Sequence, residues 1–411
     1  MDFFKVLSIS EAYNIFQGME FNRSIRPIDL KDSLFYVLAE DIVAREDWPL
    51  WPRATMDGYA VRAKDTFGAS EQNPAYLTLI GEQKIDDLPQ QEIGAGQCMS
   101  IVTGALLPKG ADSVLMIEYT AQAGDDLIEV RKSLFPQENI ILQAEDFAKG
   151  QVVVPKGTRI SFKEIGAMAT LGYARPKVYK KPKIGIISTG DELVRVEDRP
   201  RLGQVRDVNS FTLYSLLEAN GYKAKVYPFV KDNKIEFKQA VEEALSEQDL
   251  LLLSGGSSIG TRDLTLEVLE QLEGSKVIFH GLAISPGKPT LLVQWQDKFI
   301  FGLPGQVTSA QIVLMVIVLP FLRIWNGETQ VLDNLWPKKI QAVLNRNIAS
   351  RYGRQDFLRV KLIQQGTKFL AKPILGKSGL IKTLLEADGL IPIPDNCEGL
   401  EQGTVVDVWL F

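Results

Sequence analysis

The chain has 411 residues, of which 45% are hydrophobic and 24% are charged, and its formal net charge is −5. This length allows about two to four domains with cores of their own, and the composition is that of an ordinary globular protein. The acidic balance argues against general nucleic-acid binding, because proteins that follow a phosphate backbone carry a basic excess.

Membrane and disulfide-rich classes are also disfavoured. The N-terminal residues 1–13 lack the pattern of a cleavable signal, and the most apolar segment, Ile312–Leu322, is about half as long as a membrane helix. The two cysteines, Cys98 and Cys397, imply no disulfide framework. We therefore expect a cytoplasmic protein with no membrane contact. The single histidine, His280, excludes structural zinc and two-histidine metal sites, which leaves carboxylates, hydroxyls, Lys, Arg and backbone amides for chemistry.

Residues 1–45 show helical signals. Ser8 and Glu11 have the spacing of a capping box, and apolar residues from Leu34 to Ile42 recur at helical spacing. The prolines in Trp48-Pro-Leu-Trp-Pro52 end this pattern. Residues 150–180 carry a second apolar helix signal at Phe162–Leu171, so residues 1–45 and 149–180 together predict an elongated, mainly helical domain.

The residues between these two parts predict an inserted, mostly β domain at 46–148. Short strand-like runs alternate there with Gly, Pro and Asp. The expected strands are Tyr76–Gly81, Met99–Thr103, Ser113–Tyr119 and Leu127–Arg131. The basic run Arg175–Lys183, with five positive charges in nine residues, fits either a solvated linker or a local positive field beside an anion site.

Strands and helices alternate from residue 184 onwards, which predicts a parallel sheet covered by helices on both faces at 181–328. The expected strands are Ile184–Ser188, Lys225–Val230, Leu250–Leu253, Lys276–Phe279, Thr290–Gln294 and Phe299–Leu303. The expected helices are Ser210–Asn220, Lys234–Ser246, Leu264–Leu272 and Val307–Arg323. Alternating strand runs after residue 335 predict a small C-terminal β domain at 329–411. The fold class is therefore α/β multidomain, with a three-layer α/β domain, an inserted β domain, a helical part and a C-terminal β domain.

Ligands of an open parallel sheet bind beyond the carboxyl ends of its strands. The segments at that edge are Thr189-Gly-Asp-Glu-Leu193, Lys231-Asp232, Ser254-Gly-Gly-Ser-Ser-Ile-Gly-Thr-Arg-Asp263, Pro286-Gly-Lys-Pro289 and Gly302-Leu-Pro-Gly305. They combine carboxylates with hydroxyls, a lysine and free amides, which suits a magnesium–phosphate complex. None is a P-loop or a dinucleotide-binding fingerprint, which counts against a standard NTPase or dehydrogenase.

These motifs resemble the molybdopterin molybdenumtransferases, a family whose module also occurs in the animal protein gephyrin. The resemblance extends to Thr55-Met-Asp-Gly-Tyr-Ala60, to Thr103-Gly-Ala and to Glu145-Asp146, and so covers essentially the whole chain. It implies the last step of molybdenum cofactor synthesis, in which adenylylated molybdopterin and molybdate react with the help of Mg²⁺ and release AMP. It also implies a homodimer in which the inserted domain of one subunit faces the sheet domain of the other, with the upstream adenylyltransferase and recipient molybdoenzymes as possible partners.

The resemblance assigns three groups of residues. The catalytic carboxylates would be Asp57, Asp146, Glu192, Asp232 and Asp263, of which Glu192, Asp232 and Asp263 would also bind the metal. The substrate would contact Thr103, Thr189, Gly190, Asp191, Gly255, Gly256, Ser257, Ser258, Pro286, Gly287, Lys288, Pro304, Gly305 and Ser309. Molybdate, a dianion, suits Ser258, Lys288 and Ser309 as partners.

The chain departs from the family pattern at a few positions. Ser285 stands where the family usually has a basic residue, and Gln306-Val307 stands where it usually has Asn-Pro. Ala144 stands in place of the family's usual glycine, and Gln143 in place of a residue that is usually basic. Fewer cations should weaken oxyanion capture, so two alternatives stay open. One is a tungstate-preferring or weakly active paralogue, and the other is a non-catalytic scaffold of the same fold. The related adenylyltransferase step is disfavoured by the flanking domains.

Overall fold

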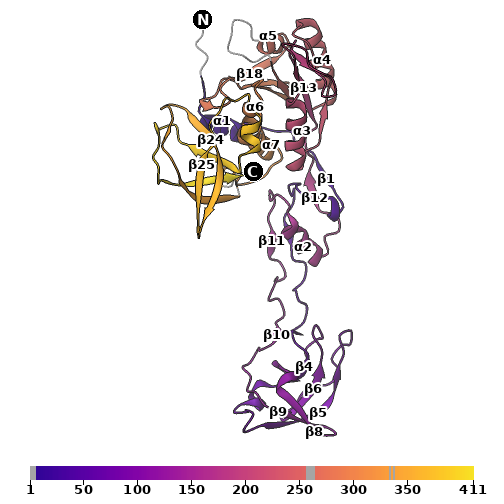
Figure 1. Cartoon of the computed structure of the whole chain (residues 1–411). Coiled ribbons are helices and arrows are strands. Elements are labelled where there is room, and N and C mark those ends of the chain that lie inside the picture. The colour runs from indigo at the N-terminus through magenta and orange to yellow at the C-terminus, as the bar shows by residue number, and fades with distance from the viewer. Residues whose placement is uncertain (1–5, 256–263, 333–334, 337) are drawn as a thin grey trace. The chain divides into compact units, whose positions relative to one another are not determined.

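The computed structural model describes residues 6–255, 264–332, 335–336 and 338–411 (Figure 1). The chain forms two compact units. The first consists of residues 1–40, 157–162 and 175–411, and the second of residues 41–156 and 163–174. The division into four domains given above stays a prediction.

A six-stranded sheet forms the centre of the first unit. Its order is β16 (Ala224–Val226), β13 (Ile184–Ser188), β17 (Leu250–Ser254), β21 (Lys298–Leu303), β20 (Leu291–Trp295) and β18 (Ser275–His280). The first four strands are parallel, as predicted, whereas β20 and β18 run antiparallel to their neighbours. The expectation of an all-parallel sheet is thus wrong for these two strands. Only two residues, Gln296 and Asp297, join β20 to β21, and a two-residue connection can join only antiparallel strands.

Helices cover both faces of this sheet, which confirms the three-layer prediction. One face packs against α1 (Ile9–Gly18), α3 (Asn209–Ala219), α6 (Val307–Val313) and α7 (Leu319–Trp325). The other packs against α4 (Lys234–Glu247) and α5 (Leu264–Glu270). Side chains of β17 alternate between the two cores, with Leu250 and Leu252 in the first and Leu251 and Leu253 in the second. This alternation explains why a strand buried on both faces is a continuous run of leucines.

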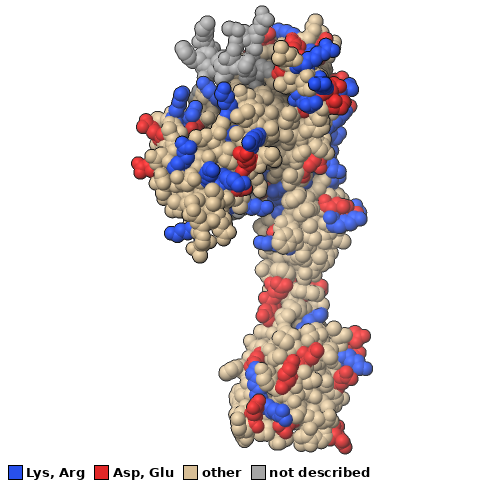
Figure 2. All heavy atoms as spheres, in the orientation of Figure 1, with Lys and Arg blue, Asp and Glu red and all other residues tan. Residues whose placement is uncertain are grey.

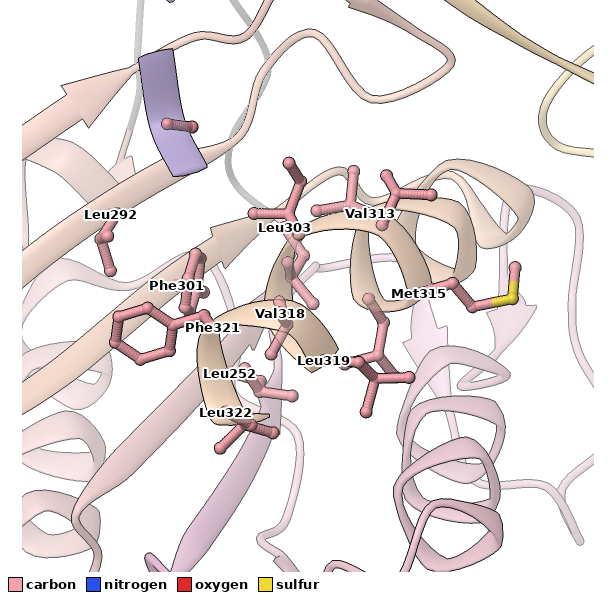
Figure 3. Packing of buried hydrophobic residues seen from close by; sticks show 14 of the residues in the cluster. Leu252, Leu292, Phe301, Leu303, Val313, Met315, Val318, Leu319, Phe321 and Leu322 are labelled. Carbon is pink, nitrogen blue, oxygen red and sulfur yellow. The ribbon is translucent and has the colours of Figure 1, made fainter. Parts of the chain in front are cut away.

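The apolar helical segment Val307–Trp325 is a core helix. It consists of α6, the π-helical turn η4 (Leu314–Val318) and α7. Its 19 residues are long and apolar enough to cross a membrane, but 83% of its most apolar window is buried in the protein. Phe321 packs edge-on against Phe301 of β21, with ring centroids 5.2 Å apart, and Leu252 belongs to the same cluster (Figure 3).

The N-terminal helix α1 begins as predicted, because Ser8 and Glu11 form a capping box. The helix expected through Leu34–Ile42 is absent. Phe35 has a φ of 64°, which no right-handed helix can accommodate, and the segment pairs instead with distant extended chain. Val37 and Leu38 form β-bridges with Arg159 and Val178.

The C-terminal residues form a small barrel-like sheet, as the β prediction required. Its strands are β22 (Lys339–Leu344), β24 (Gln355–Gln365), β25 (Lys368–Pro373), β26 (Gly389–Ile393) and β28 (Val405–Leu410). A short strand from the α/β region, β19 (Ile284–Ser285), joins this sheet by pairing with β24. The barrel therefore holds the segment that leads into Pro286-Gly-Lys-Pro289.

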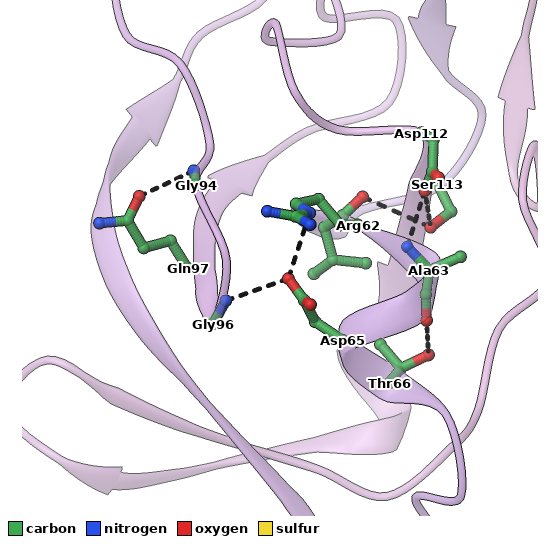
Figure 4. Close-up of polar contacts among 10 residues, drawn as sticks. Arg62, Ala63, Asp65, Thr66, Gly94, Gly96, Gln97, Asp112 and Ser113 are labelled. Carbon is green, nitrogen blue, oxygen red and sulfur yellow. Dashed lines mark hydrogen bonds and ion pairs between the residues drawn. The ribbon is translucent and has the colours of Figure 1, made fainter.

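The second unit is built on another six-stranded sheet. Its order is β7 (Ser113–Met116), β4 (Gly58–Val61), β6 (Gln97–Ile101), β5 (Ala75–Gln83), β9 (Leu127–Val130) and β8 (Thr120–Gly124), so the four strands expected here are confirmed. The helix predicted at Phe162–Leu171 is present as α2 (Phe162–Thr170), and all of it from Lys163 onwards belongs to this unit. After β4, Asp65 accepts a hydrogen bond from Gly96 N (3.0 Å) and pairs with Arg62 (3.5 Å), while Asp112 accepts one from Ala63 N (2.7 Å) (Figure 4).

Candidate functional site

A cavity of about 950 Å³ lies in the first unit, beyond the carboxyl ends of β13, β17 and β21. Eleven of the residues predicted to form the site line it. They are Thr189, Gly190, Glu192, Asp232, Gly255, Pro286, Gly287, Lys288, Pro304, Gly305 and Ser309. The parallel strands bring these segments together, although as many as 120 residues separate them in sequence. Their individual roles stay a prediction.

The loops after β13 and β16 hold each other through carboxylates. Thr189 Oγ1 donates to Asp232 Oδ1 (3.0 Å), and Asp232 N donates to Asp191 Oδ1 (3.1 Å). Lys231 Nζ donates to Asp191 O (2.7 Å). Asp191 was predicted to bind substrate, but it does not line the cavity. Its carboxylate accepts from the backbone N–H of Asp232 and so holds that backbone in place, and its contact with substrate stays a prediction.

Glu192 points a free carboxylate at this edge. Its oxygens would lie 2.6 and 2.8 Å from a Cβ on Gly190, so a larger residue at position 190 would displace them. Among the residues that the structure describes, the Glu192 carboxylate has no hydrogen-bond or ion-pair partner. It is therefore available to a cation or to a hydrogen-bond donor of a substrate.

A buried polar network supports the cavity from below. Asp207 Oδ1 accepts from Ser188 Oγ (3.0 Å) and from Ser210 N (3.1 Å), and it is only 7% exposed. Asn209 Nδ2 donates to Ser254 Oγ (2.7 Å) and to Gly305 O (2.8 Å). These bonds connect the ends of β13 and β17 to the start of α3, and they fix the backbone at Gly305.

The turn after β17 requires glycine. Gly255 has a φ of +111°, and a Cβ there would lie 2.1 Å from the carbonyl oxygen of Thr189. The ends of β13 and β17 can approach this closely only because no side chain intervenes. The predicted residues Gly256, Ser257, Ser258 and Asp263 lie outside the described residues.

Lys288 contributes a cation to the lining of the cavity. It is exposed, and within the described part of the chain its ammonium group has no carboxylate partner. Its backbone oxygen accepts from Leu282 N and Thr290 N, each at 2.9 Å, which fixes the segment after β19. Ser309 is only 4% exposed and lies near the start of α6, also facing the cavity.

The C-terminal barrel supplies a wall that sequence reasoning missed. Arg351, Tyr352, Arg354 and Ser378 also line the cavity. Arg354 is paired with Asp356 (2.9 Å), whereas Arg351 has no ion-pair partner among the described residues. Ser378 O accepts from Thr308 N (3.1 Å) and Thr308 Oγ1 (2.7 Å), which joins the barrel to α6. The only sequence signal was two arginines within Ser350-Arg-Tyr-Gly-Arg354.

The other predicted residues belong to the second unit. Thr103 donates to Asp57 Oδ1 through its backbone N (2.7 Å) and its hydroxyl (2.8 Å), and these two bonds lower the pKa of Asp57. A Cβ on Gly58 would lie 1.9 Å from Leu115 O, which explains the glycine in the Asp-Gly pair. Asp146 is exposed, and its backbone N donates to Trp48 O (3.2 Å).

The residues that fit a metal ion are oxygen donors. No group of three His, Cys, Asp or Glu side chains in the described ranges is arranged to hold a metal. Glu192 and Asp232 both line the cavity, and the third predicted ligand, Asp263, lies outside those ranges. Two carboxylates facing one cavity match the preference of Mg²⁺ for oxygen ligands.

Comparison with known proteins covers nearly the whole chain. Residues 7–172 match the MoeA N-terminal region (domain I and II), residues 185–324 the probable molybdopterin binding domain, and residues 341–411 the MoeA C-terminal region (domain IV). A Methanocaldococcus jannaschii protein, provisionally named a molybdopterin biosynthesis protein, is 39% identical over 95% of this chain and 93% of its own length. The molybdopterin molybdenumtransferase of Bacillus subtilis is 34% identical over 93% of this chain and 89% of its own.

Solved structures show the same similarity in three dimensions. A crystal structure of the molybdopterin biosynthesis MoeA protein from Pyrococcus horikoshii covers 99% of this chain and 100% of its own, at 30% identity and a TM-score of 0.81. Another crystal structure of a molybdopterin biosynthesis MoeA protein, also from Pyrococcus horikoshii, has 34% identity, a TM-score of 0.75 and 99% coverage of both chains.

Proposed function

This chain belongs to the molybdopterin molybdenumtransferase family, enzymes of molybdenum cofactor biosynthesis, and we propose that it inserts molybdenum into adenylylated molybdopterin. In the proposed reaction, molybdate and the adenylylated pterin enter, and AMP and the molybdenum cofactor leave. We further propose that the reaction takes place in the cytoplasm.

The observation that carries this proposal is the composition of the 950 Å³ cavity. Its lining combines the carboxylates of Glu192 and Asp232 with the cations of Lys288 and Arg351. A volume of this size accommodates a ligand of nucleotide dimensions. Carboxylates and unpaired cations in one cavity suit a ligand that has both an anionic end and donor groups or a bound cation.

The cations that line the cavity suit the oxyanion. Molybdate carries two negative charges, so Lys288 and Arg351 would attract it, and the hydroxyl of Ser309 would donate to one of its oxygens. Ser258, outside the described residues, stays a proposed partner. Ser285 and Gln306 also line the cavity but bring no positive charge, so capture would depend on Lys288 and Arg351.

The carboxylates that line the cavity suit a magnesium ion. Glu192 and Asp232, together with Asp263, would hold Mg²⁺, which would neutralise charge on the phosphates of the adenylylated substrate. Asp232 is held by Thr189, and its backbone is held by Asp191, so its carboxylate would need no rearrangement to bind. Thr189, Gly190, Gly255 and Gly305 would contribute backbone groups at the strand ends.

We propose that a second copy of the chain completes the site with Asp57, Thr103 and Asp146. The second unit supports this on charge, because it carries 19 Asp and Glu against 11 Lys and Arg, whereas the cavity walls of the first unit carry unpaired cations. Acidic side chains are frequent on its visible face (Figure 2). Along α3 and the residue before it, Val208, Phe211 and Tyr214 recur every third position and are 37%, 57% and 38% exposed, an apolar stripe typical of a protein interface.

The test is release of AMP from adenylylated molybdopterin when molybdate and Mg²⁺ are added to the purified protein. We expect turnover by the wild type, and a fall of about 100-fold or more for Glu192→Gln and Asp232→Asn. Lys298→Gln, a change at the start of β21 away from the cavity lining, is the matched control and should retain activity. Tight pterin binding without AMP release would refute the transferase and favour a scaffold.

Tungstate provides the second arm of the same assay. The loss of the usual basic residue at Ser285 motivates the alternative of a tungstate-preferring paralogue. Faster AMP release with tungstate than with molybdate at equal concentrations would support that alternative, and a preference for molybdate would exclude it. Pull-down with the upstream adenylyltransferase or a recipient molybdoenzyme would test the proposed partners.

A further inference from the structure

The basic run Arg175–Lys183 is only partly explained by the fold. Arg175 pairs with Asp29 (3.2 Å) and Lys177 pairs with Glu40 (3.5 Å), so these two cations have structural partners. Lys181 and Lys183 instead line a second cavity. The proposed transferase reaction uses none of these residues.

This second cavity has a volume of about 800 Å³ and lies in the first unit, at the amino ends of β13 and β16. It is therefore at the opposite end of these strands from the candidate active site. Five of its lining residues are basic, namely Arg26, Lys181, Lys183, Lys223 and Lys225. Asp32 is the one acidic residue among those that line it.

Lys181 lies at the most buried point of the basic group. Its Nζ donates to Gly221 O (2.6 Å) at the end of α3 and lies 4.1 Å from the ring centroid of Tyr36. Arg26 Nη2 donates to the hydroxyl of the same Tyr36 (2.8 Å). Burial, followed by the charges of Arg159 and Arg26, lowers the pKa of Lys181 to about 8. The positive charges of Arg159 and Arg26 thus oppose the charge on Lys181.

The rim of the cavity adds two cations without partners. Lys183 and Lys223 are exposed, and neither has an ion-pair partner in the part of the chain that the structure describes. Lys225 pairs with Glu247 (2.5 Å). Lys234 and Lys238 of α4, which do not line this cavity, pair with Glu267 (3.3 Å) and Glu242 (3.8 Å). The cavity lining thus includes two lysines, Lys183 and Lys223, without an ion-pair partner among the described residues.

We propose that this cavity binds a polyphosphate group, carried either by a nucleoside triphosphate or by inorganic polyphosphate. Several convergent cations with no carboxylate partner favour a ligand of high negative charge over a monovalent anion. Ile28, Leu34 and Tyr36 supply an apolar wall that would contact the base of a nucleotide. The proposal is independent of the transferase reaction, because the two cavities share no lining residue.

The test is calorimetric titration of the whole protein with inorganic triphosphate and, separately, with ATP, at low salt and without molybdate. We expect saturable binding that the double variant Lys183→Ala/Lys223→Ala weakens about tenfold or more, and that added salt also weakens. Lys234→Ala/Lys238→Ala is the control, because it also removes two lysines of the first unit, but ones that have carboxylate partners and do not line this cavity. Circular dichroism and thermal unfolding of both double variants check that they fold.

Lys288→Ala, which changes the other cavity, separates the two sites. Triphosphate binding that survives in Lys288→Ala but weakens in Lys183→Ala/Lys223→Ala supports the proposal. Equal binding by Lys183→Ala/Lys223→Ala and the wild type, or loss in Lys288→Ala alone, overturns it. Tighter binding of ATP than of triphosphate identifies a nucleotide as the ligand, and equal binding identifies the polyphosphate group alone.

Discussion

Asp207 offers the sharpest test of the network beneath the candidate site. Replacing it by alanine removes the acceptor of Ser188 Oγ (3.0 Å) and of Ser210 N (3.1 Å) at a position that is only 7% exposed. Hydrogen bonds to a charged group contribute about 1.5–3 kcal/mol each. Ser188 keeps its contact with Ser210 Oγ (2.9 Å), and removing a buried carboxylate also removes its desolvation cost. We therefore expect a net loss of about 2–3 kcal/mol.

Hydrogen exchange read by mass spectrometry measures this loss where it arises. The amides of α3, whose first turn Asp207 holds, should lose protection by about 30- to 150-fold, since 1.4 kcal/mol corresponds to a factor of ten. Asp207→Asn keeps an oxygen acceptor and should lose less than half as much free energy. Asp198→Ala, an exposed change in the preceding loop, is the control and should leave α3 unchanged. Protection of α3 in Asp207→Ala equal to that in Asp198→Ala would refute the reasoning.

Three further predictions concern single side chains. Ala144 has a φ of 59°, so Ala144→Gly should relieve about 1–2 kcal/mol of backbone strain in the folded state. The glycine also makes the unfolded chain more flexible, which costs about 0.4–1 kcal/mol. The melting temperature should therefore rise, and a lower melting temperature would contradict this prediction. Because folding lowers the pKa of Lys181 to about 8, the unfolded protein binds more protons than the folded protein above that pH. The free energy of unfolding of the wild type, measured in urea relative to Lys181→Met, should therefore rise between about pH 8 and 10. A fall over this range would show that the pKa of Lys181 is raised and not lowered. Lys288→Ala should raise the molybdate concentration for half-maximal AMP release by about tenfold. An unchanged concentration would contradict a role for Lys288 in binding the oxyanion.

Local signals in the sequence predicted local structure well. The capping box of Ser8 and Glu11 marked the start of α1, and the leucine run before Ser254 marked β17. Helical spacing failed at Leu34–Ile42, because apolar residues at that spacing also suit extended chain that is buried by distant partners. Nothing in the pattern indicated the left-handed backbone of Phe35.

The candidate site was predictable to the extent that strand ends define it. Parallel strands place Thr189, Asp232 and Gly255 at one edge whatever the rest of the chain does. Arg351 and Ser378 were not predicted, because their position in the cavity lining depends on the pairing of β19 with β24. These two strands are about 70 residues apart in the sequence. Long-range pairing of short strands leaves no periodic trace in the sequence.

The packing of α1 has a consequence for the order of synthesis. Phe16 of α1 lies edge-on against Phe321 of α7, with ring centroids 5.1 Å apart, although about 300 residues separate them. At the usual rate of translation, roughly 15–60 s pass between the appearance of these two side chains. During that time the apolar face of α1 cannot reach its final partner. We infer that the nascent first unit is open to chaperones and proteases until the ribosome has passed the core helix, whereas the strands of the second unit, β4 to β9, are all present much earlier.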